Sequence, residues 1–129
     1  MKKLVFVICA LLFLTGCSEV ENRIYSETDQ TELEQILNKR DDITGYTSVM
    51  NKDDILVAIE VGTFKRFQKT KIESKIKKAI EKEYPDKEVV VTGDMKIRWE
   101  IEKIVDKKQK NEELTESMEK IKSLSKEET

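Results

Sequence analysis

The chain has 129 residues, of which 24 are Lys or Arg and 26 are Asp or Glu, and it contains two Cys, one Pro and no His. That length allows one modest domain, and the absence of His removes the commonest general base and metal ligand. A formal net charge of −2 argues against a dedicated nucleic-acid binder, which carries a strong basic excess. The composition therefore favours binding or structural work over catalysis.

The N-terminus has the pattern of a bacterial lipoprotein signal. Met1-Lys2-Lys3 is a short positive segment, and residues 4–14 form an unbroken apolar run of eleven residues. The run is shorter than the about 20 residues that a helix needs to cross a bilayer, but it suits a secretory signal. It ends in Leu14-Thr15-Gly16-Cys17, a lipobox, whose cysteine thiol receives a diacylglycerol before cleavage makes it the first residue. We predict a signal peptide over residues 1–16 and lipidation of Cys17, against the alternative of an ordinary signal peptide.

Lipidation would leave no free cysteine in the mature chain. Cys9 lies inside the apolar run and leaves with the signal, so no disulfide can form. After residues 1–16 are removed, 113 residues remain, with 22 basic and 26 acidic side chains and a formal charge of −4. We expect this chain on the extracytoplasmic face of the cell membrane, held there by its diacylglyceryl-cysteine.

The first elements after the signal are a tether, a short helix and a hairpin. Residues 17–27 are polar and lack periodicity, which is typical of a tether. Asp29 followed by Glu32 resembles a capping box, and the apolar positions that follow predict a short helix ending near Arg40. Residues 46–50 form a weak strand candidate and residues 55–61 a strong one, with turn residues between them that favour a β-hairpin.

The second half of the chain alternates between helix and strand. Residues 69–84 have helical apolar spacing, and Pro85 ends this helix. Residues 88–92 predict a strand, and Asp94 can cap the helix after it. The final segment is amphipathic, and either continues that helix or forms a second one from near Asn111.

These elements predict a small α+β domain over residues 28–106, with a charged helical tail over residues 107–129. The expected order is helix, strand, strand, helix, strand, helix, which gives a three-stranded mixed sheet backed by helices. The apolar stripe of the tail either folds onto the core or binds a partner protein. The candidate partner-binding residues are Leu114, Met118 and Ile121.

Few residues of the mature chain could carry catalysis, and we expect no catalytic residue, no metal site and no cofactor. The only mature cysteine is the lipidation site, and the acidic doublets Asp41-Asp42 and Asp53-Asp54 lack the ligand spacing of a calcium loop. A carboxylate pair of the kind that hydrolyses glycosides stays open as an alternative, because 26 acidic residues make close pairs unavoidable.

The most distinctive charge feature is a basic stripe on the helix over residues 69–84. Its lysines, at helical spacing, are Lys71, Lys75, Lys78 and Lys82. Just upstream, Phe64-Lys65-Arg66-Phe67 places two cationic side chains between two aromatic ones. The functional interpretation is a face that meets phospholipid headgroups or wall polymers. The alternative is a solvated helix face, with Phe64 and Phe67 packed under the sheet edge.

Several of these segments, taken in order, resemble the YhcN/YlaJ-type sporulation lipoproteins of endospore-forming Firmicutes. Besides the lipobox and the lysine-rich helix, they are Asp54-Ile55-Leu56-Val57-Ala58-Ile59, Tyr84-Pro85-Asp86 and Glu88-Val89-Val90-Val91-Thr92-Gly93-Asp94. The resemblance runs from Ile43 to Val105 and is closer to the YlaJ branch. The chain lacks the long Asn-rich linker and the Phe-Pro ending of some members.

The resemblance implies a lipid-anchored protein of the spore or forespore membrane. It implies a role in spore assembly or germination, beside other spore-envelope or cortex-lytic proteins, and it carries over no catalytic residue. Two functions stay as alternatives: a small peptidoglycan-acting hydrolase with a carboxylate pair, and a general envelope-stress lipoprotein.

Overall fold

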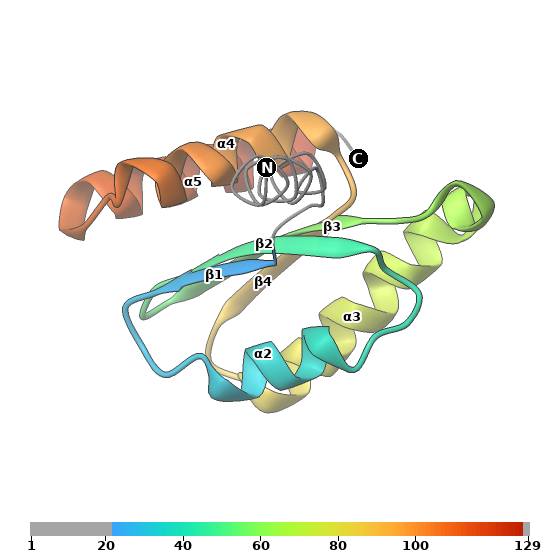
Figure 1. Cartoon of the computed structure of the whole chain (residues 1–129). Coiled ribbons are helices and arrows are strands. Elements are labelled where there is room, and N and C mark those ends of the chain that lie inside the picture. The colour runs from blue at the N-terminus through green and yellow to red at the C-terminus, as the bar shows by residue number, and fades with distance from the viewer. Residues whose placement is uncertain (1–21, 128–129) are drawn as a thin grey trace, which may run out of the picture.

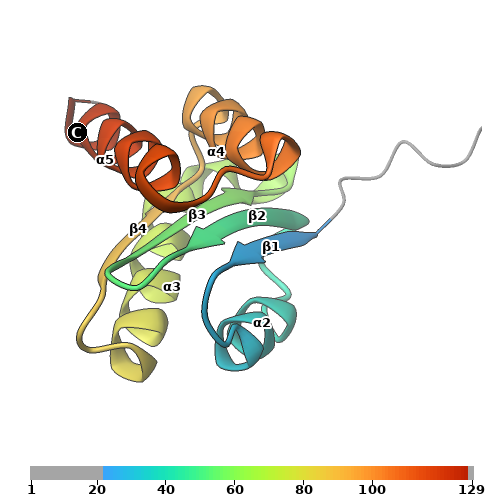
Figure 2. The ribbon, with the colours of Figure 1, turned by 90° about the vertical axis from the view of Figure 1, so that its left-hand side faces the viewer.

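The computed structural model describes residues 22–127, in which a mixed sheet lies between two pairs of helices (Figures 1 and 2). The strands are β1 (Arg23–Ser26), β2 (Gly45–Met50), β3 (Asp54–Glu60) and β4 (Glu88–Thr92). The helices are α2 (Thr31–Asn38), the 3₁₀ helix η1 (Thr63–Gln68), α3 (Lys69–Glu83), α4 (Met95–Lys107) and α5 (Asn111–Glu127). The expected α+β class is confirmed.

The sheet has four strands in the order β1-β2-β3-β4, one more than predicted. β1 is parallel to β2, β2 is antiparallel to β3, and β3 is parallel to β4. The additional strand, β1, lies within the segment that the sequence predicts as a tether. Its four residues pair with β2 from Arg23 opposite Thr47 to Ser26 opposite Met50.

Both faces of the sheet are buried under helices, which explains why the central strand β3 is apolar on both sides. One face packs against α2 and α3, and the other packs against α4 and α5 (Figure 2). Along β3, Ile55 and Val57 belong to the first core, whereas Leu56 and Ala58 belong to the second. Successive side chains of β3 therefore point alternately into the two cores.

Turn and capping residues set the boundaries of the elements. The side chain of Asn51 accepts hydrogen bonds from the backbone N–H groups of Asp53 and Asp54, which closes the β2–β3 hairpin. Asp94 caps α4 by accepting a hydrogen bond from the Lys96 N–H at 2.8 Å. The expected hairpin and the expected Asp94 cap are both confirmed. The capping box expected at Asp29 is not formed, because the N-cap of α2 is Gln30, and Asp29 instead accepts a hydrogen bond from the Thr31 N–H.

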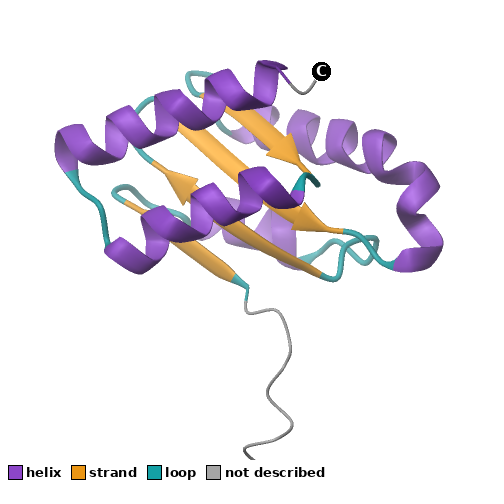
Figure 3. Ribbon diagram, turned by 90° about the horizontal axis from the view of Figure 1, so that it is seen from above, coloured by secondary structure: helices purple, strands orange, loops and turns teal. Residues whose placement is uncertain are grey.

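The C-terminal segment forms a separate helix, α5, which lies beside α4 over the same face of the sheet (Figure 3). The chain reverses between the two helices, where Lys108 and Asn111 have positive φ values of 51° and 55°. This left-handed conformation ends α4, and asparagine adopts it more readily than most residues. Of the two sequence-based alternatives, the structure therefore has the helical pair.

Candidate functional site

The basic stripe of α3 is fully on the surface. Lys71, Lys75, Lys78 and Lys82 are all exposed, and within residues 22–127 none of them forms an ion pair. The opposite side of the helix carries the buried residues Ile72, Ile76 and Ile80. The stripe is therefore available for contact with an anionic surface or polymer.

The three candidate partner-binding residues of the C-terminal helix lie in the core. Leu114, Met118 and Ile121 are at most 1% exposed and pack against the sheet with residues of α4. These side chains are therefore unavailable to a partner, because their apolar surface is already covered by the protein itself. Cys17, the predicted lipidation site, lies outside the described residues.

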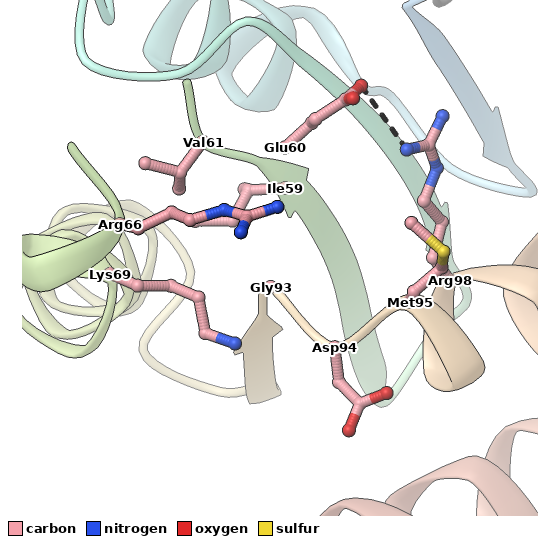
Figure 4. Close-up of a pocket in the computed structure, with 9 residues that line it drawn as sticks. All are labelled: Ile59, Glu60, Val61, Arg66, Lys69, Gly93, Asp94, Met95 and Arg98. Atoms are coloured by element: carbon pink, nitrogen blue, oxygen red, sulfur yellow. Dashed lines mark hydrogen bonds and ion pairs between the residues drawn. The ribbon is translucent and has the colours of Figure 1, made fainter. Parts of the chain in front are cut away.

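A pocket of about 540 Å³ opens where β3 and β4 end (Figure 4). Because these strands are parallel, both of their carboxyl ends reach the same edge of the sheet. The pocket is lined by Ile59, Glu60, Val61, Arg66, Lys69, Gly93, Asp94, Met95 and Arg98. Sequence reasoning does not locate it, because its walls come from η1, α3, α4 and two strand ends.

Three cations and two carboxylates line this pocket. Arg98 is held by Glu60 at 3.2 Å and by Glu102 at 3.1 Å. Arg66 and Lys69 have no ion-pair partner among residues 22–127, and Figure 4 shows both on the side of the pocket across from Met95 and Arg98. Two unpaired cations beside a concave surface provide suitable chemistry for an anionic group.

Gly93 keeps the floor of the pocket open beside Lys69. A Cβ atom at this position would lie 2.9 Å from the Lys69 Cδ atom, so any larger residue would displace that side chain. The Gly93 N–H donates a hydrogen bond to the Glu73 carboxylate at 2.5 Å. The glycine and the carboxylate thus fix the backbone at the end of β4 while Lys69 lies across it.

Large apolar side chains are exposed around the pocket. Phe67 of η1 is 100% exposed, and Met95 and Trp99, one turn apart on α4, are 59% and 57% exposed. The alternative interpretation of Phe67, that it packs under the sheet edge, is therefore wrong. In the sequence, this surface is signalled by residues 64–67, where two cationic side chains stand between two aromatic ones.

Carboxylates do approach each other closely at the opposite end of the sheet, but around a lysine. Lys122 of α5 lies 2.9 Å from Asp54, 2.8 Å from Glu88 and 3.0 Å from Glu119. The hydrogen bond from Lys122 lowers the pKa of the Glu88 carboxyl, outweighing the opposing effect of burial. A glycosidase needs a general acid whose pKa is raised, and the pKa of Glu88 is shifted in the opposite direction.

One residue of each acidic doublet, Asp42 and Asp54, forms an ion pair within the fold. Asp42 forms an ion pair with Arg40, and the hydrogen bond from Arg40 lowers the pKa of the Asp42 carboxyl. Within residues 22–127 there is no group of three or more potential metal ligands in a suitable arrangement. None of the helices in that range has both the length and the apolar composition required to cross a bilayer.

The sequence and the fold together define a class: a lipobox followed by a small three-layer α+β domain with a densely charged exterior. Comparison with protein families identifies the family, because residues 17–127 match the sporulation lipoprotein YhcN/YlaJ family, and the chain belongs to it. The predicted resemblance is confirmed and extends well beyond residues 43–105, while the match does not separate the YlaJ branch from the rest. No curated protein and no solved structure matches the chain.

Family membership supports the general location and biological context of the protein. A sporulation lipoprotein is a membrane-anchored protein of the cell envelope, which agrees with the predicted lipobox. The family match begins at Cys17, the residue that the lipobox assigns to the lipid.

Proposed function

We propose that the protein is a lipid-anchored, non-catalytic binding module that acts in spore assembly or germination on the outer face of a spore or forespore membrane. The observation that carries this proposal is the family match, which covers the whole chain from the predicted lipid-bearing Cys17 to residue 127. The domain presents exposed unpaired cations on α3, whereas the three carboxylates of its acidic cluster all pair with Lys122.

The contact face in this proposal is the basic stripe of α3. Four exposed lysines on one side of a helix attract an anionic surface or polymer, because their positive charges add up along one face. The other side of the helix is anchored in the core by Ile72, Ile76 and Ile80. Binding at the stripe therefore needs no rearrangement of the domain.

Substitution of Cys17 by Ala tests the anchored role. We compare germination, followed as the fall in optical density of a spore suspension, in three strains: wild type, gene deleted, and Cys17→Ala. We expect the deletion to impair spore formation or germination and Cys17→Ala to reproduce that defect, with the protein lost from the membrane fraction. A Cys17→Ala strain that behaves as wild type would show that the anchor is unnecessary.

The non-catalytic part of the proposal has its own test. Purified protein is run in a gel containing peptidoglycan, renatured, and compared with a known peptidoglycan hydrolase. We expect no clearing at the position of this protein. A cleared band that disappears in Glu88→Gln would establish a hydrolase that uses the carboxylate cluster and would overturn the proposal.

A further inference from the structure

The point where the chain enters the folded domain lies near the carboxyl end of β3. The side chain of Asn22 accepts a hydrogen bond from the Tyr46 N–H at 3.1 Å, and Arg23 pairs with Thr47. Gly45, two residues before Thr47, pairs with Glu60, the last residue of β3. Strands lie about 5 Å apart and rise about 3.3 Å per residue, so Arg23 is about 12 Å from the end of β3.

The same end of the domain carries the exposed apolar and unpaired cationic side chains described above. We call this the tether-side surface, and it consists of Arg66, Phe67, Lys69, Met95 and Trp99. The exposed Lys65 adjoins it and lies close enough to Asp42 to help lower the pKa of that carboxyl. Its two halves are joined by the pocket, since Arg66 and Lys69 line one side and Met95 lines the other (Figure 4). Exposed aromatic and cationic side chains thus gather at the end from which the chain leads to its anchor.

The segment between anchor and domain is short. Four residues separate Cys17 from Asn22. Even fully extended, the chain from Cys17 to Asn22 spans at most about 18 Å. A domain held on so short a segment stays beside the lipid headgroups, and the end nearest the attachment point is the end that can reach them.

We propose that the tether-side surface rests on the anionic phospholipid bilayer, with Phe67 and Trp99 at the level of the headgroups. This inference builds on the proposed lipid anchoring and adds the orientation of the domain. Trp is enriched at membrane interfaces, where an apolar ring and a polar N–H are both accommodated. The cations Lys65, Arg66 and Lys69 supply the attraction for lipid phosphates, and the pocket between Lys69 and Met95 has room for a headgroup.

The single tryptophan of the chain makes the orientation measurable. Acylated protein is reconstituted into phosphatidylglycerol-containing vesicles whose acyl chains carry bromine, and the emission of Trp99 is compared with that in unbrominated vesicles. We expect quenching of Trp99 and a shift of its emission to shorter wavelength. Unquenched emission from protein that floats with the vesicles would overturn the orientation while leaving the anchor intact.

A matched control places the only tryptophan at the opposite end of the domain. In Trp99→Phe/Asp86→Trp, the probe occupies the exposed turn before β4, beside the starts of β3 and β4. We expect no quenching there. Equal quenching at both positions would mean that the domain lies on the bilayer without a preferred end, and protein that fails to float at all would contradict the proposed anchoring instead.

The contribution of the cations is tested in the same acylated protein. We expect Lys65→Gln/Arg66→Gln to lose most of the Trp99 quenching, whereas Lys78→Gln/Lys82→Gln, which removes the same charge further along α3, retains it. If the second pair abolishes quenching and the first does not, the α3 stripe is the membrane contact. If neither pair of substitutions changes the quenching of Trp99, and an added soluble protein prevents that quenching, the tether-side surface binds a protein partner instead of the bilayer.

Discussion

Lys122 is the residue that ties the C-terminal helix to the sheet by charge. Its side chain is 11% exposed, and its ammonium group contacts Asp54, which is 6% exposed, and Glu88, which is 52% exposed. Burial lowers the pKa of Lys122, but the hydrogen bonds to Glu88, Asp54 and Glu119 outweigh it, so the pKa lies above its ordinary value of 10.5. The charge is therefore present throughout the physiological range of pH.

Removal of this lysine leaves the Asp54 carboxylate buried without its partner. We expect Lys122→Met to reduce the free energy of unfolding by about 2–4 kcal/mol, because an uncompensated buried charge is costly. Lys120 is exposed on the same helix and forms no ion pair within the described residues. Lys120→Met should change stability by no more than about 0.5 kcal/mol. Urea unfolding at pH 7 measures both, and equal values for the two variants would contradict the structural role of Lys122.

Wild type and Lys122→Met should also differ in how their stability responds to acid. The folded-state pKa of Glu88 lies below its ordinary value of 4.5, so its contribution to stability is present above that pH and is lost as the pH falls through the folded-state pKa. The contribution of Lys122 to stability is complete at every pH below 10.5, so the loss of stability in acid reports the protonation of Glu88. Wild type should therefore lose more stability than Lys122→Met between pH 6 and pH 3.

At the scale of elements, α5 is part of the folded domain. Leu114, Met118 and Ile121 cover one face of the sheet together with α4. Deletion of residues 113–129 would expose Val49 and Leu56, which are fully buried, and burial of one such side chain contributes about 1.5–3 kcal/mol. We expect the truncated chain to lose cooperative thermal unfolding.

A point substitution separates this packing effect from a general effect of truncation. Met118→Ala should cost about 2–5 kcal/mol, the usual range for a buried methionine reduced to alanine. Ser123→Ala, on the exposed side of α5, should leave the melting temperature almost unchanged. A melting temperature for Met118→Ala equal to that of wild type would contradict the packing of α5 on the sheet.

The sequence predicts those helices and strands whose apolar spacing and boundary residues lie within or next to the element itself. The α3 helix was predicted because its isoleucines recur at helical spacing and Pro85 follows it, and β4 because its three valines precede Gly93. β1 escaped prediction because its four residues carry no clear alternation, and its strand conformation depends on pairing with β2. Tyr25 reinforces that pairing at long range by donating a hydrogen bond to the Gln109 carbonyl at 2.7 Å.

The candidate sites also differ in whether local sequence is enough to predict them. The lysine stripe follows from helical periodicity and is found on the surface. The pocket could not be predicted, because it exists only where the ends of β3 and β4 meet η1 and α4. The role of Leu114 in the core was undecided from periodicity alone, since an apolar stripe looks the same whether it covers the protein's own sheet or a partner.

At the scale of the whole molecule, the proposed orientation assigns different neighbours to the two basic regions. The tether-side surface meets the bilayer, and α3 runs from this end towards the start of β4, because Glu83 precedes the Pro85 turn and Glu88 pairs with Asp54. Lys82 lies eleven residues after Lys71, a rise of about 16 Å along the helix. The distal lysines of the stripe therefore lie beyond a Debye length of about 8 Å from the headgroups.

An anionic polymer outside the membrane is therefore the expected partner of Lys78 and Lys82. Lys78→Gln/Lys82→Gln should weaken binding of the vesicle-anchored protein to polyglycerol phosphate several-fold, with Trp99 quenching unchanged, because these side chains are too far from the bilayer to contribute to its contact. Lys65→Gln/Arg66→Gln should have the opposite pattern, with quenching lost and polymer binding retained. Co-sedimentation of labelled polymer with the vesicles measures binding. Loss of both properties in either variant would show that the two regions contact one surface, and that α3 lies along the membrane rather than rising from it.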